Sequence, residues 1–114
     1  MEDCIFCKIA NGQIPSAFLY EDDQIVVIND INPQAPVHML ILPKKHIQSV
    51  AAAADEDKDL LGHMMITAKK MAEMRGIAQS GFRLIVNTGK DGAQSVPHLH
   101  MHVLGGTQLA EKMV

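Results

Sequence analysis

Histidine alternates with an aliphatic residue three times in the segment 98–104, which is His-Leu-His-Met-His-Val-Leu. Successive side chains of a strand point to opposite faces of a sheet, so this spacing predicts a strand with its imidazoles on one face, roughly 6.6 Å apart. Leu99, Met101 and Val103 would lie on the other face and anchor the strand in a core. A core requires no histidine, so the imidazole face needs a chemical explanation.

The residues alone leave three interpretations of this histidine row. It can be a solvated surface, a zinc cluster that uses alternating histidines as ligands, or a site where histidine does covalent or acid–base chemistry. Strict alternation favours the third interpretation, because scattered surface histidines show no such pattern.

Length and composition limit the class of protein. A chain of 114 residues with 47% hydrophobic residues predicts one domain, residues 1–114, whose core is filled by aliphatic side chains and eight Met. The net charge of −3 and the lack of a basic run argue against nucleic acid as a partner. No apolar run is long enough to cross a bilayer, and the acidic start lacks the features of a signal peptide. We therefore expect a cytoplasmic protein without a membrane partner.

The hydrophobic pattern predicts an α+β fold, in which an antiparallel sheet of about five strands packs against one long helix. The helix should cover 56–75, with Asp55 as its N-cap and His63 on its exposed side. The stripe expected to face the sheet is Leu61, Met64, Met65, Ala68 and Ala72. The predicted strands are 17–21, 24–28, 37–42, 81–87 and 98–104, and a helical turn is expected at 4–10. Segment 37–42 is apolar except for His38, which predicts a central strand.

Several polar residues fall where they can approach the histidine row. Small residues in the loop 88–96 allow backbone N–H groups and the Ser95 hydroxyl to contact an anion. Asp30 can accept hydrogen bonds from sugar hydroxyls, while His38 and Asn87 lie on strands that can neighbour the row. Apolar residues near the N-terminus can cover a flat base: Ile5, Phe6 and Ile9. Together they indicate a ligand with a phosphate and a sugar beside a histidine nucleophile.

Cys4 and Cys7 form a Cys-x-x-Cys pair. A structural disulfide is not expected in a reducing compartment, and a thioredoxin-like pair would follow a strand, which this pair does not. Half of a zinc site, completed by ligands from elsewhere in the chain, is the better interpretation.

The ordered set of motifs resembles the histidine triad superfamily of nucleotide hydrolases and transferases, and within it the histidine triad nucleotide-binding proteins. The resemblance covers nearly the whole chain. Besides 98–104, the matching segments are 4–9, 30–38, 43–47, 60–63, Asn87, 91–96 and 105–106. It implies a single domain of the histidine triad fold and a homodimer that joins two sheets through the long helix and the following strand.

The activity implied by the resemblance is hydrolysis of purine nucleoside phosphoramidates and aminoacyl adenylates, with release of AMP or GMP and no catalytic cofactor. His100 matches the nucleophile that forms a covalent nucleotidyl-histidine. His102 matches the residue that contacts the phosphate and assists the leaving group. The backbone carbonyl of His98 matches the group that orients the nucleophile, and His38 matches a fourth supporting histidine.

The resemblance also implies a purine nucleotide site. Asp30 matches the ribose-binding acid, while Asn87 and Ser95 match groups that contact the phosphate or the leaving group. The full set expected to bind the nucleotide is Ile5, Phe6, Ile9, Asp30, Ile31, Asn87, Ala93, Gln94, Ser95, His100 and His102.

Many bacterial members of this superfamily hold a structural zinc ion through residues that match Cys4, Cys7, His46 and His98. Two thiolates and two imidazoles suit a closed tetrahedral site. The alternative is a pair of free buried cysteines with a surface His46.

Two departures from the family pattern affect the expected site. Ala93 stands where a glycine is common, and its methyl group disfavours positive φ. The segment 107–114 lacks the aromatic, proline-containing tail of eukaryotic members, so the preferred leaving group is not predicted. Three alternative functions stay open: a dinucleoside polyphosphate hydrolase, whose branch usually carries Gln at the position of His102, a non-catalytic nucleotide-binding or scaffolding module, and a zinc hydrolase.

Overall fold

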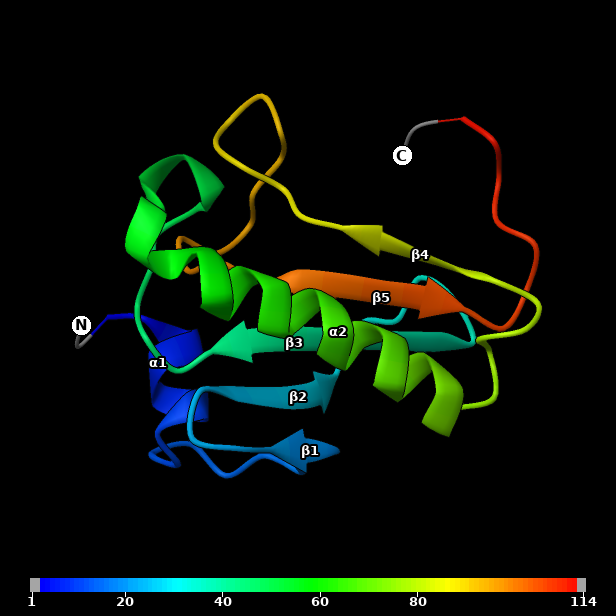
Figure 1. Ribbon diagram of the computed structural model, residues 1–114, viewed down its shortest axis with the longest axis horizontal. Helices are drawn as coiled ribbons and strands as arrows, with labels where there is room; N and C mark the ends of the chain where they lie inside the picture. The colour runs from blue at the N-terminus through cyan, green and yellow to red at the C-terminus, as the bar shows by residue number, and fades with distance from the viewer. Residues whose placement is uncertain (1–2, 113–114) are drawn as a thin grey trace.

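A computed structural model describes residues 3–112, and in it a five-stranded antiparallel sheet carries a long helix across one face (Figure 1). The strands are β1 (Tyr20–Glu21), β2 (Ile25–Asn29), β3 (Val37–Pro43), β4 (Phe82–Ile85) and β5 (Met101–Gly105). The helices are α1 (Ile5–Ala10) and α2 (Lys58–Met74), and short 3₁₀ turns occupy Val50–Ala52 and Asp55–Asp57. The sheet order is β1-β2-β3-β5-β4. The predicted α+β class and antiparallel sheet are confirmed.

The two faces of the sheet have different residues and pack against different elements, as the alternation in the histidine segment predicts. Leu99, Met101 and Val103 are buried in the core between the sheet and α2. On the opposite face, α1 packs its own smaller core against β2 and β3, and Phe6 of α1 contacts the rings of His98 and His100. Every residue of β3 is buried, in keeping with its predicted central place. The histidines therefore lie on the face without the long helix.

The predicted histidine strand is too long at its start. β5 begins at Met101, so His98 and His100 precede the ladder. Met101 pairs with Ile41, and the same register would place Leu99 opposite Pro43, which has no N–H to donate. Leu99 instead donates its N–H to the carbonyl of Ile47, at 2.7 Å.

The start of the long helix also differs from the prediction. α2 begins at Lys58, after a 3₁₀ turn that includes Asp55. The carboxylate of Asp57 accepts hydrogen bonds from the Ala54 N–H, at 2.9 Å, and from the Lys45 ammonium, at 2.6 Å. Asp55 as N-cap is therefore wrong, because the chain turns once more before the α-helix starts.

The helix face toward the sheet is rotated from the predicted stripe. Met65 is 53% exposed, so its predicted place in the core is wrong. A helix advances about 100° per residue, so a face centred on Met64 and Ala68 turns Met65 aside. His63, expected to be exposed, lies with its Nε2 only 2.6 Å from the Asp22 carboxylate. The buried residues are Leu60, Met64, Thr67, Ala68, Met71 and Ala72.

The remaining boundaries lie within a few residues of prediction, except at the sheet edges. Of 17–21, Tyr20 and Glu21 form the register pairs with β2 and the Leu19 N–H donates to the Val27 carbonyl oxygen, while β4 is shorter than 81–87. An edge strand has a neighbour on one side only, so less of it is held in the ladder. Between residues 3 and 112, no helix has the length and apolarity to span a membrane.

Candidate active site

His100 lies just before β5 and is buried. Its Nδ1 is 2.7 Å from the backbone carbonyl oxygen of His98. Because a carbonyl oxygen only accepts, Nδ1 must donate, and the neutral ring keeps its lone pair on Nε2. The ring of Phe6 meets the ring of His100 edge-on, with centroids 5.0 Å apart. In its neutral form His100 thus leaves Nε2 with a lone pair, as a nucleophile requires.

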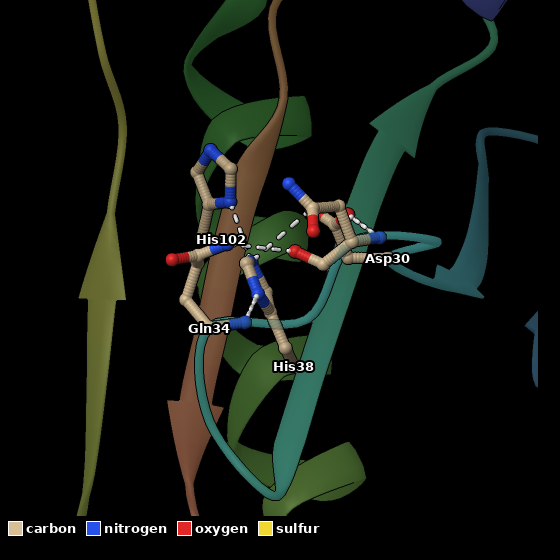
Figure 2. A network of polar contacts seen from close by, with 5 residues as sticks. Asp30, Gln34, His38 and His102 are labelled. Carbon is tan, nitrogen blue, oxygen red and sulfur yellow. Dashed lines mark hydrogen bonds and ion pairs between the residues drawn. The ribbon is translucent and has the colours of Figure 1, made fainter.

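A second group, the aspartate–histidine cluster, consists of Asp30, His38 and His102 (Figure 2). Strand pairing places Leu40 opposite His102, which brings His102 diagonally next to His38 on the same face. His38 Nε2 lies 2.9 Å from His102 Nδ1 and 3.3 Å from Asp30 Oδ2. This cluster unites three residues that were expected in the site.

The backbone N–H of Gln34 determines which nitrogen carries the proton in this cluster. It donates to His38 Nδ1 at 3.0 Å (Figure 2). His38 must therefore carry its own proton on Nε2 and donate it to His102 Nδ1 or to Asp30. The shorter of these two contacts is the one to His102 Nδ1, which therefore accepts, so the proton of a neutral His102 ring lies on Nε2. Burial is the main cause that lowers the pKa of His102 to about 4; the neighbouring ionisable groups His100 and His38 act in the same direction, and Asp30 opposes them. The ring is therefore neutral at pH 7 and has a hydrogen-bond donor at Nε2.

A cavity of about 460 Å³ adjoins His38 and His102. Its other walls include Arg83 and Ile85 of β4, Leu104 of β5 and Leu109 of the C-terminal segment. That segment turns back toward β4 after β5 (Figure 1), and the Arg83 guanidinium donates a hydrogen bond to the carbonyl oxygen of Ala110. The volume suits a small-molecule group, and the chain's own C-terminal segment forms part of the wall.

The loop 88–96 is held in shape mainly by side-chain amides. Gln94 accepts from the Gly89 N–H at 2.9 Å and donates to the carbonyls of Gln48 and Val96 at 2.7 and 2.9 Å. Asn87 donates to the Gly92 carbonyl at 2.8 Å. These two residues were expected to contact the nucleotide, and their amides already have partners, in the loop itself and at the Gln48 carbonyl.

Two small residues shape the same loop. Ala93 has a φ of 58°, in the left-handed region that was expected to be strained for alanine. A Cβ on Gly92 would lie only 2.3 Å from the Thr88 carbonyl oxygen, so the backbone approaches itself too closely for any other residue there. Ser95 is exposed beside them, where its hydroxyl is accessible to a ligand.

The residues expected to cover the base differ in exposure. Phe6 is buried against the histidines, while Ile9 is partly buried. Ile5 is half exposed and Ile31 is fully exposed. Asp30 is partly buried, and its Oδ1 accepts from the Asn32 N–H at 2.8 Å.

A third group, the cysteine–histidine cluster, brings together the four residues expected to bind zinc: Cys4, Cys7, His46 and His98. His98 Nδ1 lies 3.2 Å from Cys4 Sγ, 3.4 Å from Cys7 Sγ and 3.2 Å from His46 Nδ1. His46 Nδ1 lies 3.2 Å from Cys7 Sγ. Zn–S bonds of about 2.3 Å and Zn–N bonds of about 2.0 Å in a tetrahedron would put such pairs roughly 3.3 to 3.6 Å apart. The four donors thus fit one zinc ion.

Protonation within the cysteine–histidine cluster also suits a metal. His98 Nε2 lies 2.8 Å from the Pro43 carbonyl oxygen and must donate to it, which leaves the Nδ1 lone pair toward the sulfurs. Burial is the main cause that lowers the pKa of His98, and burial likewise raises the pKa of Cys7 to about 11. A bound cation would reverse the effect on the thiol, because it stabilises the thiolate.

Four contributors to these sites were not predicted from the sequence. The Gln34 N–H and the Pro43 carbonyl are backbone groups, and no sequence pattern signals their role. Arg83 could have been found, since it lies on the same face of its strand as Asn87. Leu109 reaches the cavity only through the path of the C-terminal segment.

The fold and these clusters define a small α+β protein with a row of histidines on the face of its antiparallel sheet that lacks the long helix. The family model described as "Scavenger mRNA decapping enzyme C-term binding" matches residues 3–113. Protein HitA of Neisseria gonorrhoeae is 49% identical over 105 residues, which are 92% of this chain and 97% of that protein. These matches point to one family.

Solved structures agree. A histidine triad protein from Clostridium difficile is 48% identical, with a TM-score of 0.95 over 99% of this chain and 98% of that one. A HIT family hydrolase from Legionella pneumophila is 46% identical, with a TM-score of 0.94 over 96% and 97% of the two chains. The chain belongs to the histidine triad family.

Proposed function

We propose that this protein hydrolyses purine nucleoside phosphoramidates and aminoacyl adenylates through a covalent nucleotidyl-histidine on His100, releasing AMP or GMP. The observation that carries the proposal is the 2.7 Å contact between His100 Nδ1 and the His98 carbonyl, which leaves Nε2 free to attack phosphorus. The similar protein from Legionella is named a hydrolase, which supports a hydrolytic reaction.

In the first step, the Nε2 lone pair of His100 attacks the α-phosphorus and the bond from phosphorus to the leaving group breaks. The ring of His100 gains a positive charge, which its Nδ1–H shares with the His98 carbonyl. The rings of His100 and His102 have centroids 5.1 Å apart, so this charge makes His102 more acidic as the amine departs. His102 Nε2 then gives its proton to an amine leaving group, and the negative charge left on the His102 ring is balanced by the positive charge on the His100 ring. A carboxylate released from an aminoacyl adenylate leaves as an anion and needs no proton.

In the second step, water attacks the phosphorus and the bond to His100 Nε2 breaks. When the leaving group was an amine, His102 Nε2 takes a proton from the water, which restores both neutral rings. The bond from His38 Nε2 to His102 Nδ1 keeps the His102 ring oriented in both steps. The sum is one water consumed and one nucleoside monophosphate released with the amine or the acid.

Substrate placement follows from the neighbours of these rings. We propose that Asp30 binds the ribose, that the loop 88–96 with Ser95 contacts the phosphate, and that Phe6 lies at the base pocket with Ile5, Ile9 and Ile31. The leaving group then occupies the cavity beside His102, because that cavity adjoins the ring that donates the proton.

We also propose that the cysteine–histidine cluster holds one structural zinc ion. The convergence of four donor atoms with a lone pair on His98 Nδ1 supports it. All four positions of a tetrahedron would be filled by protein, so this ion would stabilise the fold and would have no open position for water.

A homodimer is the proposed assembly. Apolar side chains are exposed on α2 and after β4, with Met65 and Ile66 each 53% and Met74 66% exposed. β4 is an edge strand, so its outer side has unpaired backbone groups. An interface with a second copy that covers these apolar side chains and the outer edge of β4 would remove apolar surface from water and could pair the free backbone groups.

Substitution of the nucleophile tests the reaction. With a fluorogenic adenosine phosphoramidate, His100→Ala should lower kcat by about a thousandfold or more, while AMP binding by calorimetry persists. Acid-quenched turnover of a labelled substrate by the unsubstituted protein should trap the nucleotide on His100. Full turnover by the His100→Ala protein would reject the mechanism.

A further inference from the structure

His98 joins the cysteine–histidine cluster to His100. Its ring Nδ1 lies 3.2 Å from Cys4 Sγ and 3.4 Å from Cys7 Sγ, and its Nε2 lies 2.8 Å from the Pro43 carbonyl. Its backbone carbonyl accepts the hydrogen bond from His100 Nδ1 at 2.7 Å. One residue therefore presents a donor atom to the cluster and the acceptor that determines the tautomer of His100.

The position of that carbonyl is not fixed by the sheet. β5 begins only at Met101, and the backbone bonds of the preceding segment run to Val96, from the His98 N–H, and to Ile47, from the Leu99 N–H. Ile47 directly follows His46, which is itself a member of the cluster. Through Ile47, the segment that carries the nucleophile is thus attached to the neighbour of a second member of the cluster.

Phe6 provides a second connection. It lies between the two cysteines in the sequence of α1. Its ring contacts His98 edge-on, with centroids 6.0 Å apart, and His100 edge-on at 5.0 Å. A shift of the cysteines would therefore move the ring that packs against His100.

We propose that the cysteine–histidine cluster, when one metal ion holds its four donors, positions His100 for catalysis. The fixed ring of His98 fixes the carbonyl of His98, and that carbonyl holds His100 in the tautomer with a free Nε2. Without the metal, no bond holds the four donors together, so His98 can rotate and His100 samples the other tautomer. The catalytic consequence rests on the proposed function, while the effect on the His100 ring does not.

The direct test follows the His100 ring itself. Protein labelled with ¹⁵N-histidine is prepared with zinc and after chelation, and long-range ¹H–¹⁵N spectra report the protonated nitrogen of each ring. The His100→Gln variant assigns the His100 signals. We expect a single Nδ1–H tautomer with zinc and a mixture without it, together with a fall in kcat of about tenfold or more and a KM changed by less than about twofold.

Two substitutions at one ligand separate metal binding from loss of the cysteine. Cys7→Ser should weaken zinc binding, so that in a zinc titration the His100 signal and kcat change with the same midpoint. Cys7→His keeps four ligands and should behave like the unsubstituted protein. His63→Gln removes a histidine that bonds Asp22 and is not a member of the cluster, and it should change neither readout.

Identical His100 signals in the zinc-loaded and chelated protein, both folded by circular dichroism, would overturn the proposal. If the chelated protein unfolds, zinc- and cadmium-loaded proteins are compared instead. Cadmium, the larger ion, must then shift the His100 signals and lower kcat. If neither the signals nor kcat change, the proposal is overturned. Failure of the proposed function looks different: neither form would turn over the phosphoramidate, while the ring tautomer would still depend on the metal.

Discussion

The cysteine–histidine cluster and the aspartate–histidine cluster differ in chemistry because of one backbone group each. In the first, the Pro43 carbonyl takes the Nε2 proton of His98 and leaves the Nδ1 lone pair for a cation. In the second, the Gln34 N–H occupies Nδ1 of His38 and leaves the proton on Nε2. An acceptor at Nε2 thus leaves a lone pair on Nδ1 that suits a metal, and a donor at Nδ1 leaves a proton on Nε2.

Counting potential ligands does not distinguish the two clusters. Each brings at least three suitable atoms within 4.8 Å of one another. A metal on the aspartate–histidine cluster would need the Nε2 lone pair of His38, and the neutral ring would then carry a proton on Nδ1 facing the Gln34 N–H. Two donors would point at each other, which disfavours the zinc hydrolase alternative on the chemistry of the site.

Metal content provides the largest expected difference between the clusters. We expect about one zinc per chain by elemental analysis, as one four-ligand site implies. Its removal should lower the free energy of unfolding by about 4 kcal/mol, relative to protein with free zinc at a thousand times the Kd. Urea unfolding with zinc and with chelator measures this loss.

A substitution in the other cluster provides the control for metal content. His38→Asn should leave the zinc content at one per chain, because His38 is not among the proposed ligands. Two zinc ions per chain in the unsubstituted protein and one in His38→Asn would show that both clusters bind metal. Protein purified without chelator that contains no zinc would contradict the proposed site in the cysteine–histidine cluster.

The tautomer of His38 can be changed without touching a histidine. Gln34→Pro removes the N–H that donates to His38 Nδ1, whereas Gln34→Ala keeps it and removes only a side chain that bonds the Asn32 carbonyl. We expect Gln34→Pro to lower kcat by about tenfold to a hundredfold and Gln34→Ala to change it little. Added zinc should inhibit the Gln34→Pro protein more strongly, because His38 can then offer Nε2.

Steady-state kinetics on the two variants, with folding checked by circular dichroism, measures both effects. Equal kcat values for Gln34→Pro and Gln34→Ala would show that the backbone donor has no part in the reaction.

Acid should destabilise the protein partly through His102. Its folded-state pKa of about 4 lies below the ordinary value near 6.5, so the unfolded chain binds a proton that the folded protein refuses. The contribution of neutral His102 to the free energy of unfolding is complete above pH 6.5 and is lost as the pH falls to about 4. Urea unfolding at several pH values should show that the free energy of unfolding falls less steeply over this window in His102→Gln than in the unsubstituted protein. The cysteine–histidine cluster is the same in both proteins, so its acid sensitivity cancels; parallel curves would contradict the assignment.

Much of the fold could be predicted because its signals are local. Alternation around Leu99 and Met101 identifies the core face of the last strand, and the apolar run at 37–42 identifies the central strand. The errors occur where tertiary contacts decide: Pro43 ends the ladder opposite Leu99, and an extra turn moves the helix start past Asp55. Neither depends on a pattern within the segment itself.

The candidate site shows the same division. Side chains such as His38, His102 and Asp30 could be named from the sequence, and the structure brings them together. What each nitrogen does could not be predicted, because the deciding groups are the Gln34 N–H and the Pro43 carbonyl. Every residue except proline has both such groups, so only the folded chain shows which of them meets a ring.

The smallest expected effect concerns the loop 88–96, which is held by the Asn87–Gly92 bond and by the Gln94–Gln48 bond. Ala93 has a φ of 58° there, which costs an L-residue about 1 kcal/mol or slightly more. Ala93→Gly removes that strain but adds freedom to the unfolded chain, so we expect a gain of only about 0.5 kcal/mol in unfolding free energy. Because Gln94 and Asn87 hold the loop, KM for the phosphoramidate should stay the same; a large change in KM would mean that Ala93 itself shapes the phosphate site.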